Sequence, residues 1–107
     1  MRALACLLAL FVATAANARG DAVSGQKKAA QVCAACHGPD GNKPSAPDQP
    51  ILAGQHYDYL VRALSDYKAG HRTNPIMKGF AGQLSKQDIE DLAAWFASQK
   101  SALHDQR

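Results

Sequence analysis

The hydrophobic positions of the chain form one continuous run near the start, followed by three segments that mix apolar and polar residues. The run covers residues 3–13. In the segment 55–69, apolar residues recur at i, i+3, i+4 and i+7, which is the spacing of one helix face. These residues are Tyr57, Leu60, Val61 and Leu64. A helix is therefore predicted over residues 55–69, with Gly70 as its left-handed C-cap.

Two further helices are predicted, one before and one after this segment. Residues 23–35 contain good helix formers, and Asp21 or Ser24 is available as the N-cap. The third helix begins with Ser85 and Asp88, a capping-box pair in which Asp replaces the preferred Glu. Its apolar face consists of Ile89, Leu92, Ala93 and Phe96, with Trp95 beside it.

Two stretches between the helices have no periodic pattern. Residues 38–54 contain four of the five prolines, which predicts a long ordered loop or a linker. Residues 73–84 contain Pro75, Gly79 and Gly82, and this stretch is predicted to be irregular as well. No segment alternates apolar and polar residues in the manner of a strand. The predicted fold class is therefore all-α, with three main helices and long loops.

The apolar run at the start has the features of a secretory signal peptide. Arg2 gives a short positive region, and Ala16-Asn17-Ala18 has the small-x-small form of a cleavage site. The run is too short to cross a bilayer as a helix, although an uncleaved anchor is the alternative. Residues 1–18, Cys6 included, are therefore predicted to be removed. Residues 19–107 are predicted to form a single exported domain with no integral membrane segment.

The segment 19–107 contains only 19 large apolar side chains when Ala and Cys are left out. A domain with so small a core usually needs a disulfide, a metal or a cofactor to be stable. Without Arg2 the formal net charge falls from +3 to +2. The basic residues are dispersed and are not interleaved with aromatic ones, so the sequence predicts no nucleic-acid partner.

Cys33-Ala34-Ala35-Cys36-His37 is the most specific motif of the chain, and this pattern is typical of covalent haem attachment. Residues i and i+3 lie on one face of a helical turn, so both sulfurs can reach the two vinyl groups of one porphyrin. His37 then lies beneath the iron, where its imidazole can coordinate the metal. The motif predicts one haem c, bound through Cys33 and Cys36, which would fill the sparse core.

Three alternatives for the cysteine pair remain. A disulfide or a thioredoxin-like redox pair would suit an exported protein, but the βαβ pattern is missing. A zinc site would need two more ligands, and the other histidines show no ligand spacing; they are His56, His71 and His104. The third alternative is a chance match of five residues.

A haem iron that is bound by one histidine has either a second protein ligand or an open position. Met77 is the only methionine after Met1, and it follows His37 by 40 residues. Methionine more often fills gaps in a core, but a methionine in the irregular stretch 73–84 can close over the opposite face of the haem. Met77 is therefore predicted as the sixth ligand. Its rivals are His56, His71 and His104.

With these features in place, the chain resembles the class I c-type cytochromes. The likeness is greatest to their small single-haem bacterial members and to one half of their dihaem periplasmic relatives, and it covers residues 25–99. The resemblance implies the class I cytochrome c fold, in which three main helices and long loops surround one covalent haem. It rests on Cys33-Ala-Ala-Cys36-His37-Gly38, Pro50-Ile-Leu-Ala-Gly-Gln55, Tyr59-Leu60, Gly70-His-Arg72, Met77, Leu84-Ser85-x-x-Asp88-Ile89 and Ala94-Trp95-Phe96.

The resemblance also implies roles for single residues. Gly25 would let the first and last helices cross closely, with Trp95 at the crossing. The Pro50 carbonyl would accept a hydrogen bond from the second ring nitrogen of His37 and so fix the ring. The residues expected near the haem propionates are Arg72 and, as further candidates, His71, Tyr57 and Gln55. The residues expected to wall the haem are Ile51, Leu52, Leu60, Leu64, Phe80 and Leu92.

Ligation by His37 and Met77 would raise the reduction potential and leave no metal position open to a substrate. Electrons would pass through the porphyrin edge near Cys33 and Cys36. We therefore expect a periplasmic single-electron carrier rather than an enzyme, a monomer that docks transiently with redox proteins. The alternative is a haem c subunit of a permanent oxidoreductase complex. A weaker alternative is an open-site haem protein that binds gas or peroxide, should Met77 be no ligand.

Overall fold

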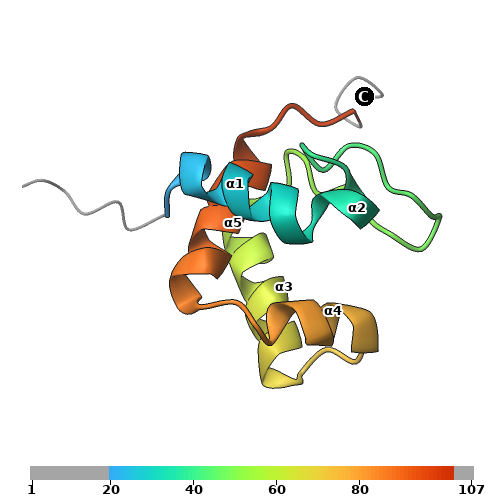
Figure 1. The fold of residues 1–107 in the computed structure, drawn as a ribbon, viewed down its shortest axis with the longest axis vertical. Helices are drawn as coiled ribbons and strands as arrows, with labels where there is room; N and C mark the ends of the chain where they lie inside the picture. Colours follow the sequence, from blue (N-terminus) through green and yellow to red (C-terminus); the bar gives the residue numbers. More distant parts are fainter. Residues whose placement is uncertain (1–19, 103–107) are drawn as a thin grey trace, which may run out of the picture.

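The computed structural model describes residues 20–102, and within this range the chain forms helices and no strands (Figure 1). The helices are α1 (Ala22–Val32), α2 (Ala34–His37), α3 (Tyr57–Ala69), α4 (Pro75–Ala81) and α5 (Lys86–Ser98). The all-α prediction is confirmed, and its three main helices are α1, α3 and α5. The predicted signal peptide over residues 1–18, and His104, lie outside the described residues.

Helices α1 and α5 cross in close contact (Figure 1). The crossing lies at Gly25, where an added Cβ would be 1.9 Å from the backbone oxygen of Asp91 and 2.9 Å from Cβ of Trp95. No side chain fits into this space, so the approach of the two helices requires glycine. The close crossing that the resemblance implied for Gly25 and Trp95 is present.

The predicted helix caps are also present. Asp21 caps α1 by accepting a hydrogen bond from the N–H of Val23. Ser85 and Asp88 form a reciprocal capping box at the start of α5, with both hydrogen bonds at 3.0 Å. Gly70 ends α3 in the left-handed conformation, with φ 84° and ψ 13°. Local side-chain chemistry therefore sets these helix boundaries.

Two helix boundaries differ from the prediction. The first helix ends at Val32 rather than at residue 35, because Cys33 has φ −111° and ψ −32°, which departs from helical geometry. The chain then turns and resumes as the single-turn helix α2. Helix α3 begins at Tyr57 rather than at residue 55, with extended backbone at His56 as its N-cap. These shifts leave the order of the main helices unchanged.

The prediction that residues 73–84 are irregular is wrong, because helix α4 lies within them. Asn74 caps this helix, and Pro75 occupies its first position, where a backbone N–H is not needed. Gly79 does not end the helix, since one glycine costs only about 1 kcal/mol relative to alanine. The proline therefore marks a helix start, and Met77 belongs to a helix rather than to a loop.

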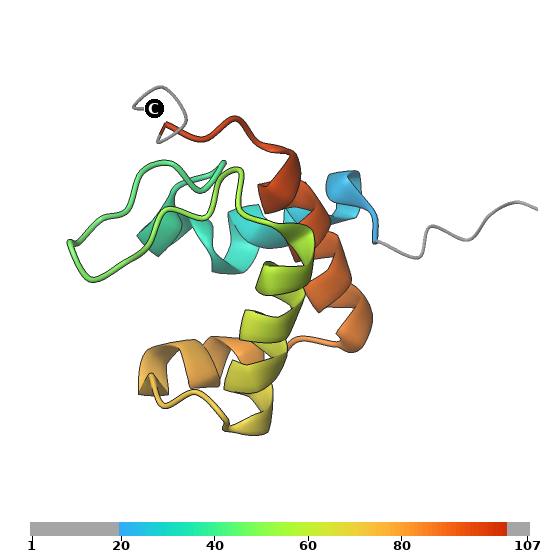
Figure 2. The ribbon, with the colours of Figure 1, turned by 180° about the vertical axis from the view of Figure 1, so that it is seen from behind.

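The core lies where α1, α3 and α5 meet, and Leu92 of α5 is its largest fully buried side chain. Figure 2 shows α3 beside α5, with α4 at the far end of α3 and the loop after α2 at the other end. The buried core cluster consists of Ala29, Leu60, Leu84, Ile89, Leu92, Ala93 and Phe96. No helix within residues 20–102 is long and apolar enough to span a bilayer.

The long segment after α2 is an ordered loop, not a linker, because hydrogen bonds fix it to the end of α5 and the chain that follows. The N–H of Gly54 donates to the carbonyl of Phe96 at 2.9 Å. The side chain of Asn42 donates to the carbonyl of Lys100 at 2.9 Å and accepts from the N–H of Ala102 at 2.8 Å. This loop forms one wall of the cavity that is described next.

Candidate cofactor site

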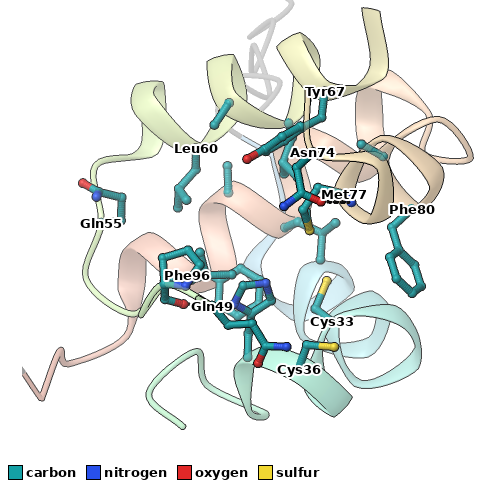
Figure 3. A pocket seen from close by; sticks show the side chains of 18 of the residues that line it. Cys33, Cys36, Gln49, Gln55, Leu60, Tyr67, Asn74, Met77, Phe80 and Phe96 are labelled. Carbon is teal, nitrogen blue, oxygen red and sulfur yellow. Dashed lines mark hydrogen bonds between the residues drawn. The ribbon is translucent and has the colours of Figure 1, made fainter. Parts of the chain in front are cut away.

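A largely apolar cavity of about 230 Å³ lies between α3, α4 and the loop after α2 (Figure 3). It separates α4 from the cysteine pair, so the two ends of the candidate site face each other across it. The residues expected to wall a cofactor all line this cavity: Ile51, Leu52, Leu60, Leu64, Phe80 and Leu92.

Cys33 and Cys36 lie side by side at one end of the cavity, and both are half-buried free thiols (Figure 3). The turn at Cys33 and the short helix α2 hold them together, since the N–H of Cys36 donates to the carbonyl of Cys33 at 3.2 Å. Burial raises the pKa of the Cys33 thiol to about 11, and the neighbouring Cys36 adds to the shift. Before any covalent attachment, Cys33 is therefore a neutral thiol near pH 7.

His37 is buried and lines the same cavity. Its Nδ1 lies 2.9 Å from the carbonyl oxygen of Pro50. A carbonyl can only accept, so Nδ1 carries the proton and Nε2 keeps an unshared electron pair. The hydrogen bond that the resemblance implied is present, and it leaves the other nitrogen free to bind a metal.

Met77 lies on α4, and its sulfur points into the cavity toward the cysteine end (Figure 3). Of the rival ligands, neither His56 nor His71 lines the cavity, and both side chains are exposed. His104 lies outside the described residues. The cavity thus brings His37 and Met77 together from helices that are far apart in the sequence, whereas the other described histidines lie elsewhere.

Arg72 also lines the cavity, and its guanidinium carbon lies 4.7 Å from the centre of the Tyr67 ring. This stacking fixes the direction of the only arginine among the lining residues. Gln55 lines the cavity too, but His71 and Tyr57 do not. Of the four residues expected near the haem propionates, Arg72 and Gln55 are therefore the two that line the cavity.

Sequence reasoning missed several cavity residues. Tyr67 follows Leu60 by seven residues on α3 and Leu64 by three, so helical spacing could have placed it on the cavity face. Asn74 precedes a proline that stands at a helix start, which is a recognised N-cap signal. Gln49, which also lines the cavity, has no comparable signal in the sequence.

The side chains of this site fit a covalently bound haem. Two thiols lie three residues apart at one end of an apolar cavity, and a buried imidazole beside them has its second nitrogen available. No group of three His, Cys, Asp or Glu side chains among residues 20–102 could hold a metal ion. The zinc alternative therefore finds no ligand set in the described part of the chain, whereas a porphyrin would supply the remaining ligands itself.

Comparison with known proteins agrees with this fit. The family model described as cytochrome c matches residues 22–100. The chain is 53% identical over 97 residues to cytochrome c4 of Pseudomonas aeruginosa, which covers 91% of this chain and 47% of that protein. It is 40% identical over 84 residues to cytochrome c-554(548) of Halomonas halodenitrificans, which covers 76% of this chain and 99% of that protein.

The fold is also similar to a solved structure. The crystal structure of reduced recombinant cytochrome c4 from Pseudomonas stutzeri superposes with a TM-score of 0.72 at 49% identity, covering 78% of this chain and 47% of that chain. The chain thus spans about half the length of the curated cytochrome c4 relatives that it matches. It belongs to the cytochrome c family, as a class I c-type cytochrome that binds haem c through Cys33 and Cys36.

Proposed function

We propose that the protein is a periplasmic single-electron carrier whose haem iron is bound by Nε2 of His37 and the sulfur of Met77. The observation that supports this most strongly is the position of Met77, whose sulfur points into the cavity that His37 lines. A bound haem c supplies one-electron chemistry at a potential that methionine ligation raises. The chain supplies the two ligands and the apolar walls.

The residues around the site act by positioning and by excluding water. The Pro50 carbonyl accepts from Nδ1 of His37, which fixes the ring and leaves Nε2 as the nitrogen that would bind the iron. Met77 would supply the second protein ligand of a bound haem iron, which would leave no metal position for a substrate. A protein of this design is a carrier rather than an enzyme, because electrons enter and leave without bond changes at the metal.

Sequence features support the proposed location, and the name of one relative supports the proposed kind of partner. The signal-peptide features of residues 1–18 support export to the periplasm. One relative, 40% identical over 70 residues, is named thiosulfate dehydrogenase electron acceptor of Stutzerimonas stutzeri. This name supports an oxidoreductase as the partner, with which we propose that the chain docks transiently as a monomer.

A permanent subunit is the second candidate function. A relative that is 35% identical over 72 residues is named cytochrome subunit of sulfide dehydrogenase of Chlorobaculum tepidum. A subunit would co-purify with one enzyme at raised salt, whereas a carrier would separate from its partner, since weak association between charged surfaces is screened by salt. Pull-down at low and at high salt separates the two.

Visible spectroscopy of the periplasmically expressed holoprotein tests the ligand pair. We expect a weak red methionine-to-ferric charge-transfer band and no response of the reduced protein to carbon monoxide. Met77→Ala should remove the band and allow carbon monoxide to bind. Lys78→Ala is the matched control, because it alters the other neighbour of Met77 on α4, which is exposed and does not line the cavity. A wild-type protein that lacks the band and binds carbon monoxide would overturn the proposal in favour of an open-site haem protein.

A further inference from the structure

We propose that Asn74 is a positioning residue for Met77, whose sulfur it keeps directed into the cavity by holding the first turn of α4. The inference rests on the proposed function, since it takes Met77 as the axial ligand. It adds a residue that does not itself contact the iron but sets how firmly the methionine is held. Asn74 lines the same cavity, next to Met77 (Figure 3).

The contact between the two residues is direct. Oδ1 of Asn74 accepts hydrogen bonds from the backbone N–H of Ile76 at 3.0 Å and from that of Met77 at 3.1 Å (Figure 3). Because Pro75 has no N–H, the first two backbone N–H groups of α4 belong to Ile76 and Met77, and the cap satisfies both. One side-chain oxygen thus fixes the backbone of the methionine from which the sulfur extends.

Helix α4 has little else to hold its first turn. It contains seven residues, of which only Ala81 is buried. Ile76 is 65% exposed and Phe80 is 46% exposed, and both side chains line the cavity rather than the helical core. A helix this short is not stable alone, and its firm attachment lies at the far end of the segment, where Nζ of Lys68 donates to the carbonyl of Leu84. The side-chain hydrogen bonds that hold the first turn come from Asn74.

Loss of this cap should make the Met77 ligand easier to displace from the iron. An external ligand such as imidazole enters only when the Met77 sulfur leaves the iron, and this opening requires the first turn of α4 to loosen. Losing an N-cap shifts a local equilibrium about fivefold. Asn74→Ala should therefore speed imidazole binding to the ferric holoprotein about fivefold and weaken the charge-transfer band. Asn74→Asp and Asn74→Ser restore a capping oxygen and should restore wild-type behaviour.

Ser85→Ala is the matched control, because Ser85 caps α5, which carries no ligand. It should lower resistance to guanidinium as Asn74→Ala does, yet leave the imidazole rate unchanged. If Asn74→Ala does not accumulate, Asn74→Thr, a weaker cap, should give an intermediate rate. An imidazole rate in Asn74→Ala or Asn74→Thr that matches wild type would overturn the inference alone, provided that wild type shows the band. A wild type without the band, unaffected by Met77→Ala, would overturn the proposed function itself.

Discussion

Asp91 accepts a hydrogen bond from the backbone N–H of Asp21 at 2.7 Å, although the two residues are 70 positions apart. Asp91 is buried in α5, and the same oxygen accepts from Nε2 of Gln87 at 2.8 Å. Asp21 is the N-cap of α1, so the bond joins the start of the first helix to the middle of the last. It lies one turn from Gly25, and the two features together fix the crossing of α1 and α5.

Replacing Asp91 by alanine should destabilise the holoprotein. The change leaves the N–H of Asp21 without its partner at a partly buried position, and a lost bond of this kind costs about 1–3 kcal/mol. Asp91→Asn keeps an acceptor oxygen and should retain most of the free energy of unfolding. Guanidinium unfolding of the three proteins measures this. Equal losses in Asp91→Ala and Asp91→Asn would show that the carboxylate charge, not the hydrogen bond, matters.

The same substitution at two glycines should have opposite effects. Gly25→Ala places a Cβ 1.9 Å from the backbone oxygen of Asp91, so the helices must separate; we expect a loss of about 3 kcal/mol. At Gly79 of α4 an added Cβ meets no atom within 4 Å, and alanine should stabilise the helix by up to about 1 kcal/mol. Thermal unfolding compares the two holoproteins. A stable Gly25→Ala protein would mean that the crossing can widen without cost.

The capping box of α5 should make stability depend on pH in the acidic range. The N–H of Ser85 donates to Asp88 and, as the largest cause, holds the pKa of that carboxyl below its ordinary value of 3.8. The unfolded chain therefore takes up the proton first, so the contribution to stability is present above about pH 4 and is lost as pH falls through the folded pKa. The stability difference between wild type and Asp88→Asn should shrink as the pH falls below about 4. A constant difference would contradict this.

What the sequence predicts well are features with a local signature. The cysteine pair with His37 needs only one helical turn, and the Ser85–Asp88 box needs only one cap, so both could be recognised within a few residues. Met77 was found by elimination, since it is the only methionine after residue 1. Each of these signals is independent of how the distant parts of the chain pack.

The sequence failed to predict two kinds of feature. One kind has a local pattern that fits two different structures, and the other depends on a contact with a residue far along the chain. The Asn74–Pro75 pair fits both a loop and a helix start, and the capping bonds to Ile76 and Met77 decide for the helix. Asp91 is polar, so apolar periodicity assigns it to the surface. In the fold it is buried, and its carboxylate accepts a hydrogen bond from the distant N–H of Asp21. The stacking of Arg72 on Tyr67 joins the end of α3 to the segment beyond Gly70, a contact that only the fold creates.

Arg72 should raise the reduction potential through its charge. A fixed cation beside the cavity favours the ferrous state, because that state has one positive charge fewer. Arg72→Gln should therefore lower the midpoint potential, by on the order of 50 mV for a charge held near the haem at an intermediate dielectric. Arg72→Lys keeps the charge but not the planar stacking on Tyr67. Its midpoint potential in a redox titration should therefore lie between those of Arg72→Gln and wild type.

Arg62 provides the matched control for this charge. Arg62 lies on α3 and does not line the cavity. Its side chain is 84% exposed and lies 3.9 Å from Asp66. Arg62→Gln therefore removes one positive charge that solvent and ions already screen. Its potential should stay close to wild type. Raising the salt concentration should shrink the effect of Arg62→Gln further but leave most of the effect of Arg72→Gln, because Arg72 is partly buried at the cavity and ions screen a partly buried charge less. Equal shifts for both variants would mean that net charge alone sets the potential and that the position of Arg72 over Tyr67 has no part in it.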